Sequence, residues 1–208
     1  SGTFMIGSIL ENSAAIPTGI LTIAGIGFIF AAAAKSAQVP LHTWLPDAME
    51  APTPISALIH AATMVNAGVY LLARFNGLFT QLPFWQPTLI WLGVITAFLA
   101  ATMAAVAFDL KRVLAYSTIS QLGYMVYAIG AGGLFESQFH LLNHAIFKGL
   151  LFLTAGAIIH AVGTREMRLM GGLRKKLPFL FILFLVGAAG LAGIPGFNGF
   201  WSKDLILE

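Results

Sequence analysis

Residues 35–54 read KSAQVPLHTWLPDAMEAPTP, and this stretch decides the fold. It holds four of the nine prolines of the chain and follows a charge-free run over residues 12–34. Proline removes a backbone donor and interrupts a helix. In a membrane such interruptions occur only where protein or water satisfies the freed backbone groups. We therefore expect a discontinuous membrane helix that is interrupted in residues 39–54, with Lys35 shortly before the break at Pro40.

The composition supports a membrane protein. Hydrophobic residues make up 58% of the chain and charged residues 9%, against about a quarter charged in a soluble domain. The mean hydropathy is +0.87. The net charge of +3 is small, and no basic tract is interleaved with aromatic residues, which argues against nucleic acid as a partner. The absence of cysteine excludes disulfides, thiolate metal sites and Cys-ligated iron–sulfur clusters.

Six segments are long enough to cross ~30 Å of hydrocarbon at ~20 residues each. They are residues 17–37, 54–75, 87–108, 113–131, 138–161 and 178–199. The sequence GIPG at 193–196 predicts a second broken helix, so we expect an all-α, polytopic bundle with two discontinuous helices. Such a pair is typical of transporters with inverted repeats, although Gly and Pro are also simply commoner in membrane helices. Residues 1–208 form one domain in this interpretation, a fragment of a longer protein.

Basic residues in the loops predict the orientation. Residues 109–112 hold Lys111 and Arg112, and the loop at 163–177, here called the basic loop, holds five further Lys and Arg residues. Counting spans places both on one side, which we expect to be the cytoplasm, matrix or stroma. The other side shows only Arg74.

Three lysines lie in or beside otherwise apolar segments. Lys35 closes the first charge-free run, Lys148 lies in the middle of the run 137–162, and Lys203 follows the run 177–202. A lysine at membrane depth costs at least a few kcal/mol and indicates function by default. Lysine also changes protonation state when it is desolvated. A bundle of this kind suits the movement of protons.

His140, His144 and Lys148 follow one another at i, i+4 and i+8. On a helix this spacing places them on one stripe, about 6 Å apart per step. Histidine gives and takes protons near neutral pH, so the stripe predicts a proton relay. Two histidines four apart are also a chelating pair, but no carboxylate or thiolate accompanies them on this helix, which argues against a metal site.

The remaining polar positions carry weaker signals. Lys35 precedes its break, where the negative end of the helix dipole favours an ammonium; the alternative is a lysine that snorkels to the interface. Lys203 follows its break, near the start of a half-helix, where the dipole disfavours the charge. His60 alone is more typical of packing than of a relay. Two acidic residues, Asp47 and Glu50, are expected to cap helices.

Several motifs are specific to one family. Beside 35–54, they are SALIHAATMV at 56–65, DLKRVLAYSTISQLGY at 109–124 and HAIFKGLLFL at 144–153. Together they closely resemble the antiporter-like subunits of proton-pumping NADH:quinone oxidoreductase, respiratory complex I. The stretches MGGLRKKLP at 170–178 and GFWSKD at 199–204 are similar to the L type of these subunits, chain 5 in mitochondria.

The resemblance implies two inverted five-helix repeats, parts of which this chain spans. It also implies the roles of the site residues, all in a proton relay: Lys35 and Lys203 as the lysines of the two broken helices, Lys148 as the connecting lysine, and His60, His140 and His144 as its companions. The glutamate that the family pairs with the first of these lysines lies outside the chain. Protons move through bound water in this picture.

By the same resemblance, the chain is a subunit of a translocase that holds no redox centre, cofactor or metal itself. NADH, flavin and iron–sulfur clusters are expected on partner subunits, and further membrane subunits and the lipid bilayer are its neighbours. The expected location is a bacterial or archaeal plasma membrane, or an organellar inner or thylakoid membrane.

Two alternatives stay open. Multisubunit sodium/proton antiporters and membrane-bound hydrogenases share the core motifs, so the sequence separates them poorly from complex I. A haem-binding electron carrier that uses the membrane histidines is a third class, and a visible absorption spectrum distinguishes it.

Overall fold

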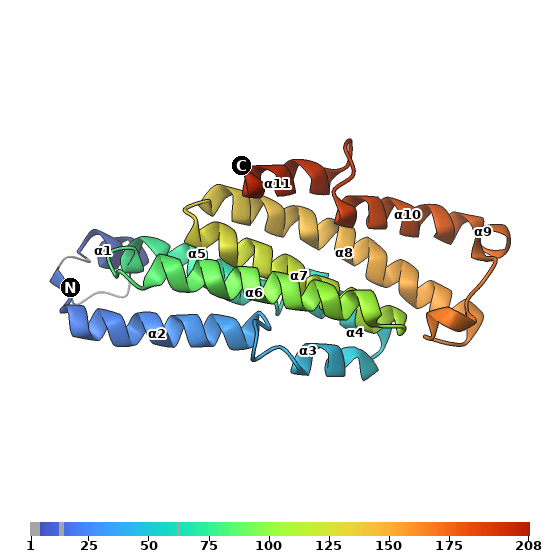
Figure 1. Ribbon diagram of the computed structural model, residues 1–208, viewed down its shortest axis with the longest axis horizontal. Coiled ribbons are helices and arrows are strands. Elements are labelled where there is room, and N and C mark those ends of the chain that lie inside the picture. The colour runs from blue at the N-terminus through green and yellow to red at the C-terminus, as the bar shows by residue number, and fades with distance from the viewer. Residues whose placement is uncertain (1–4, 13–14, 62) are drawn as a thin grey trace.

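The computed structural model describes residues 5–12, 15–61 and 63–208, and Figure 1 shows a bundle of helices along one long axis. The described residues form helices joined by turns and irregular segments, with one isolated bridge between Asp109 and Glu166, so the all-α prediction is confirmed. The elements are α1 (Ile6–Glu11), α2 (Thr18–Lys35), α3 (Trp44–Asp47), η2 (Ala48–Glu50), α4 (Thr53–Ala61), α5 (Asn66–Phe79), α6 (Trp85–Val106), α7 (Leu110–Gly130), α8 (Leu134–Val162), η3 (Met167–Leu169), α9 (Leu173–Lys176), α10 (Pro178–Ala192) and α11 (Asn198–Leu207).

Four stretches among the described residues are long and apolar enough to cross a membrane. They are Thr18–Lys35, Thr53–Phe79, Trp85–Val106 and Leu134–Val162, and α10 is a shorter apolar helix. Their outer faces are apolar; on α6, for example, Trp91 and Phe98 are exposed. These exposed rings fit a helix that faces lipid rather than water.

α7 lies inside the bundle, packed on α6, α8 and α5. Its first residues carry charge and its middle is polar, which lowers its hydropathy below that of the lipid-facing helices. It approaches α6 closely because Gly93 and Gly123 face each other: a Cβ on Gly123 would meet the Gly93 carbonyl oxygen at 2.7 Å. Small residues at such crossings let membrane helices pack backbone to backbone.

Two apolar clusters frame a polar middle. The first includes Phe79, Trp85 and Ile119, and the second includes Leu114 and Phe152. On α8, Leu134 and Leu141 pack on the first cluster, and Leu151, Phe152 and Ala155 belong to the second.

The chain leaves helical conformation at the two places where the sequence is rich in Gly and Pro. After α2 ends, Ala37 has a φ of 48° and Pro40 follows a cis peptide bond. After α10 ends, Gly193 and Gly196 have φ values of 78° and 93°, which glycine adopts without a Cβ clash. α11 then begins at Asn198.

The two basic segments lie at the same end of the bundle. The backbone amide of Leu110 donates to the Arg165 carbonyl at 3.0 Å, and the amide of Met167 donates to the Phe108 carbonyl at 2.9 Å. The prediction that both lie on one side is therefore confirmed. Their cytoplasmic, matrix or stromal location stays a prediction.

Candidate functional site

The site is built on one face of α8. His140, His144 and Lys148 are each 0% exposed, and the ring centroids of the two histidines lie 6.4 Å apart. The helix packs on α4, α7, α10 and α11, so each stripe residue meets a different set of neighbours. The predicted stripe of His140, His144 and Lys148 is therefore a row of buried side chains inside the bundle, here called the file.

His140 joins three helices. Its Nδ1 lies 2.8 Å from the Ser202 hydroxyl on α11, and its Nε2 lies 2.9 Å from Oε1 of Gln121 on α7. An amide oxygen only accepts, so with this assigned orientation of the amide the Nε2 donates. In the neutral ring Nδ1 then accepts the Ser202 O–H.

Protonation of His140 reverses one of these bonds. The charged ring donates from both nitrogens, so Ser202 Oγ becomes an acceptor and must turn its own proton elsewhere. The carbonyls of Asn198 and Gly199 each lie 3.4 Å from Ser202 Oγ and accept it. The site therefore holds partners for both protonation states of His140.

Lys148 donates to backbone and hydroxyl oxygens of α7. Its Nζ lies 2.8 Å from the Leu114 carbonyl and 2.6 Å from Ser117 Oγ. No carboxylate pairs with it among residues 5–12, 15–61 and 63–208. Neutral oxygens serve either form of an amine, so this lysine is held in place without a fixed counter-charge.

His144 and His60 are enclosed by apolar rings. His144 packs edge-on against Phe147 at 5.4 Å, and the His60 ring lies 4.7 Å from that of Phe152. Both histidines are 0% exposed, and within the described part of the chain neither of their ring nitrogens has a hydrogen-bond partner. Buried polar groups are normally satisfied by protein or water, so these four nitrogens suit contact with bound water.

Lys203 lies differently from the sequence prediction. It belongs to α11, but its ammonium reaches back across the break and donates to the Leu191 carbonyl at 2.5 Å. That carbonyl is at the C-terminal end of α10, where the helix dipole favours a cation. The expectation that the dipole disfavours its charge was therefore wrong, because the long side chain reaches from α11 back to the C-terminal end of α10.

Lys35 stands apart from the other five. It is the last residue of α2 and is exposed, and no described side chain or carbonyl bonds its ammonium. The segment after it is anchored by Ser36, whose hydroxyl donates to the Val65 carbonyl at 2.6 Å. The structure thus joins His140 to α7 and α11 and Lys148 to α7, but it leaves Lys35 on the surface of the chain.

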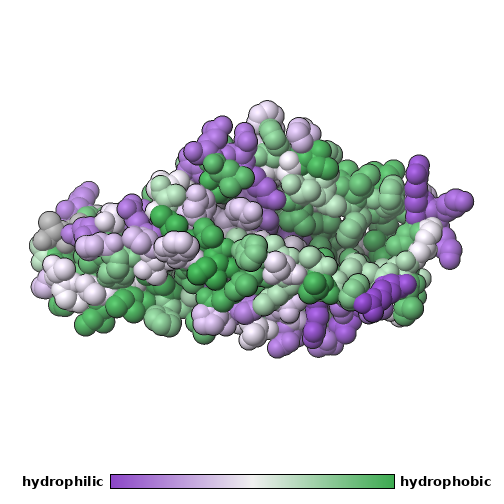
Figure 2. All heavy atoms as spheres, viewed as in Figure 1, coloured by the Kyte–Doolittle hydropathy of each residue, from purple (hydrophilic) through white to green (hydrophobic). Residues whose placement is uncertain are grey.

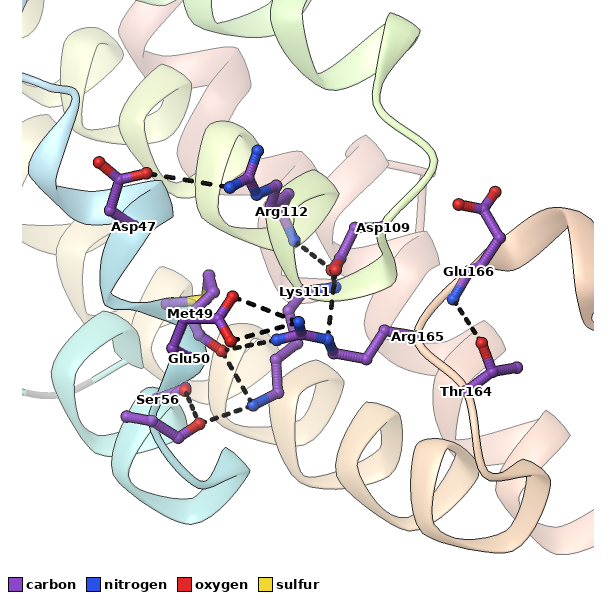
Figure 3. Close-up of polar contacts among 11 residues, drawn as sticks. Asp47, Met49, Glu50, Ser56, Asp109, Lys111, Arg112, Thr164, Arg165 and Glu166 are labelled. Carbon is purple, nitrogen blue, oxygen red and sulfur yellow. Dashed lines mark hydrogen bonds and ion pairs between the residues drawn. The ribbon is translucent and has the colours of Figure 1, made fainter.

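A second polar cluster lies at the basic end (Figure 3). Lys111 Nζ donates to the carbonyls of Met49 and Ala51 at 3.3 and 2.7 Å. Arg165 pairs with Glu50 at 3.2 Å and with Asp109 at 3.4 Å. These contacts tie the segment that follows Lys35 to the start of α7 and to the basic loop.

The acidic residues of this cluster do not have the predicted roles. Asp47 lies 3.9 Å from Arg112 and Glu50 pairs with Arg165, and neither α3 nor η2 has a side-chain capping hydrogen bond, although Asp47 stands at the N-cap position of η2. The cap is Asp109, which accepts from the backbone amides of Lys111 and Arg112 at 2.8 and 3.1 Å. Its place directly before the first residue of α7 is the signal for this cap, because Asp is a preferred N-cap residue.

Three partners of the stripe were missed from the sequence: Gln121, Ser117 and Ser202. The available signal was the run STISQ at 117–121, unusually polar for a spanning segment. Among the described residues, no three His, Cys, Asp or Glu side chains gather as a metal site.

The fold and this interior define a class: a multi-pass membrane protein with a buried file of histidine and lysine side chains between its helices. The chain belongs to the NADH:quinone oxidoreductase/Mrp antiporter transmembrane family, whose model matches residues 1–208.

Named relatives of this family are close in sequence. The chain is 51% identical to NADH-ubiquinone oxidoreductase chain 5 of Metridium senile over 97% of its own length and 34% of the relative. It is equally identical, at 51%, to the chloroplastic NAD(P)H-quinone oxidoreductase subunit 5 of Nephroselmis olivacea, over 100% of this chain and 34% of that protein. The chain thus spans about a third of the length of these relatives.

Solved structures share the fold. A structure of the Mrp complex from Dietzia sp. matches with a TM-score of 0.93 at 41% identity, over 99% of this chain and 23% of that one. A membrane-bound sulfane sulfur reductase, an archaeal respiratory membrane complex, matches with a TM-score of 0.85 at 31% identity, over 96% of this chain and 43% of that one.

Proposed function

We propose that this chain is the central part of a proton-translocating membrane subunit of NADH:quinone oxidoreductase, a translocase whose electron transfer takes place on other subunits. The names of the relatives at about half identity support the complex. The observation that supports the proton as the transported ion is Lys148. Its amine is entirely buried, is bound to neutral oxygens and has no carboxylate partner in the described residues. Such a group gains and loses a proton without breaking an ion pair.

The proposed path follows the buried file. Protons pass between Lys148 and His144 through bound water, and His140 exchanges its proton through the two-way hydroxyl of Ser202. Lys203, the next residue on α11, receives or supplies the proton at the far end. His60 belongs to α4, and its ring lies beside that of Phe152 on α8, so it extends the file from α8 onto α4.

Lys35 takes part from the surface of the chain in this proposal. It requires a partner from elsewhere in the longer protein, because an exposed amine at membrane depth is costly. The segments around Lys35 and around residues 193–197 then act as discontinuous helices, related as parts of an inverted repeat. Backbone groups of these two segments that make no helical hydrogen bond would line the ion path, as they do in transporters with discontinuous helices.

The surroundings follow from the same proposal. The subunit has other membrane subunits of its complex and the lipid bilayer as neighbours, and NADH, flavin and iron–sulfur clusters belong to partner subunits. Named relatives include a chloroplastic protein, an organellar chromatophore protein and a protein of Picosynechococcus sp.. They support a bacterial or archaeal plasma membrane, or an organellar inner or thylakoid membrane, as the location in this proposal.

A second candidate function is a subunit of an Mrp-type cation/proton antiporter, favoured by the close fit to the Mrp complex. The two functions differ in what drives the ion. In the first, oxidation of NADH builds the gradient; in the second, a sodium gradient drives protons without any electron donor.

The test uses the complete complex that contains the full-length subunit, purified and reconstituted in sealed vesicles. Addition of NADH and a quinone should acidify one side, at the same rate in sodium and in potassium media. Proton movement that needs an imposed sodium gradient and ignores NADH would assign the protein to the antiporters instead.

A further inference from the structure

An apolar cavity of about 230 Å³ lies beneath the basic loop. It is lined by side chains of α7, α8, η3, α9 and α10, among them Ile158, Met170, Leu177 and Phe181. Cavities lined by such side chains stay dry and bind apolar molecules; one of about 150 Å³ is enough for benzene. This cavity therefore suits a hydrocarbon chain. His140, His144 and Lys148 do not line it.

Three cations stand at its rim. Arg174, Lys175 and Lys176 form most of α9, and all three are exposed. The guanidinium carbon of Arg174 lies 5.8 Å from the centre of the Phe181 ring, which itself lines the cavity. The Phe181 ring thus contacts both the charge of Arg174 and the apolar cavity.

Among the described residues, no Asp or Glu side chain forms an ion pair with any of these three cations. The other arginines of the basic loop are engaged: Arg165 pairs with Glu50 and Asp109, and Arg168 lies over the Phe108 ring at 3.3 Å and beside Glu166 at 3.9 Å. From residue 167 to residue 203 the sequence contains no Asp or Glu. An excess of positive charge therefore remains at this one end of α10.

The order of the side chains fits an amphiphile. Leu173 and Leu177, four residues apart, both line the cavity, while the three cations occupy the positions between them. α10 begins at Pro178 and is apolar throughout, so the cations stand where a helix enters the headgroup region. Figure 2 shows the same change, from green surface over α10 to purple surface over α9.

We propose that this place binds an anionic phospholipid, with its phosphate on the cations of α9 and one acyl chain in the cavity. Basic pockets between membrane helices on the cytoplasmic or matrix side bind anionic headgroups, and each Lys or Arg near such a surface contributes measurably to attraction. Charge complementarity selects this occupant over a zwitterionic lipid, which offers no net negative charge.

The experiment uses the intact complex in vesicles that contain phosphatidylglycerol with a photoreactive group on its acyl chain. A matched preparation contains phosphatidylcholine with the same group. After illumination, mass spectrometry of the digested subunit should find crosslinks to peptides from residues 158–184 with the anionic probe and severalfold fewer with the zwitterionic one.

Two variants separate charge from cavity. Lys175→Gln should weaken the anionic crosslink about fivefold, equivalent to about 1 kcal/mol, and Leu177→Trp should block the acyl chain while it leaves all three charges in place. Arg74→Gln, an exposed basic residue at the other end of the bundle, serves as the control and should change nothing.

Equal crosslinking by both probes, or unchanged crosslinking in Lys175→Gln, would overturn the proposal. So would a wild-type complex without any crosslink in this region, since another part of the longer protein would then fill the cavity.

Discussion

Removal of the Ser202 hydroxyl tests whether protons pass through His140. In Ser202→Ala the ring keeps its bond to Gln121 but loses the partner of Nδ1, which now lies 2.8 Å away. The neutral ring loses the hydrogen bond that its Nδ1 accepts from Ser202, whereas the protonated ring is left with a charged N–H that has no acceptor. The substitution therefore penalises the protonated state more than the neutral state.

The size of the effect follows from the bond that is lost. A hydrogen bond to a charged group contributes about 1.5–3 kcal/mol, and a neutral one about 0.5–1.5 kcal/mol. The difference of about 1–1.5 kcal/mol corresponds to a roughly five- to thirteenfold lower population of protonated His140. If that state carries the proton, pumping should fall by about the same factor.

The assay is the number of protons moved per NADH oxidised by the reconstituted complex with the full-length subunit. Ser137→Ala is the matched control, because Ser137 is also a serine at 0% exposure, and its hydroxyl has no partner in the described residues. We expect the control to pump normally. A Ser202→Ala complex that assembles and pumps at the wild-type ratio would refute the role of His140.

Three further predictions concern the file, the packing and the topology. His140→Ala and His144→Ala should each weaken pumping and combine less than additively, because they serve one path; additive losses would indicate separate structural roles. Gly93→Ala should lower stability by about 1–3 kcal/mol through overpacking against α7, measured by thermal unfolding, whereas Gly27→Ala, with nothing within 4 Å, should not; equal melting would contradict the close helix contact. A cysteine at Gly171 should resist an impermeant thiol reagent outside intact cells, and ready labelling would reverse the proposed orientation.

The helices and the stripe could be predicted from the sequence because both depend on local periodicity. Apolar runs bounded by Gly and Pro give the spans, and the spacing of His140, His144 and Lys148 gives one helical face. Their neighbours could not be found in this way. Gln121 and Ser202 lie 19 and 62 residues from His140, and only the packing of α7 and α11 on α8 brings them together.

Side-chain direction was the second limit. The sequence indicates that Lys203 follows a Gly- and Pro-rich stretch, but not that its four-carbon side chain extends to Leu191 on the preceding helix. Asp47 and Glu50 stand at positions that suit caps, yet the arginines that come close in the fold compete for them. For Lys35 the family resemblance implies a glutamate partner, and that expectation places it outside this chain.

The central claim is that Lys148 carries protons, and Lys148→Ala in the intact complex tests it most directly. The matched control is Lys111→Ala, which also removes a buried lysine bonded to backbone carbonyls but lies outside the file. For assembled complexes that still oxidise NADH, we predict a strong loss of protons pumped per NADH in Lys148→Ala and an unchanged ratio in Lys111→Ala. A wild-type ratio in Lys148→Ala would contradict the account.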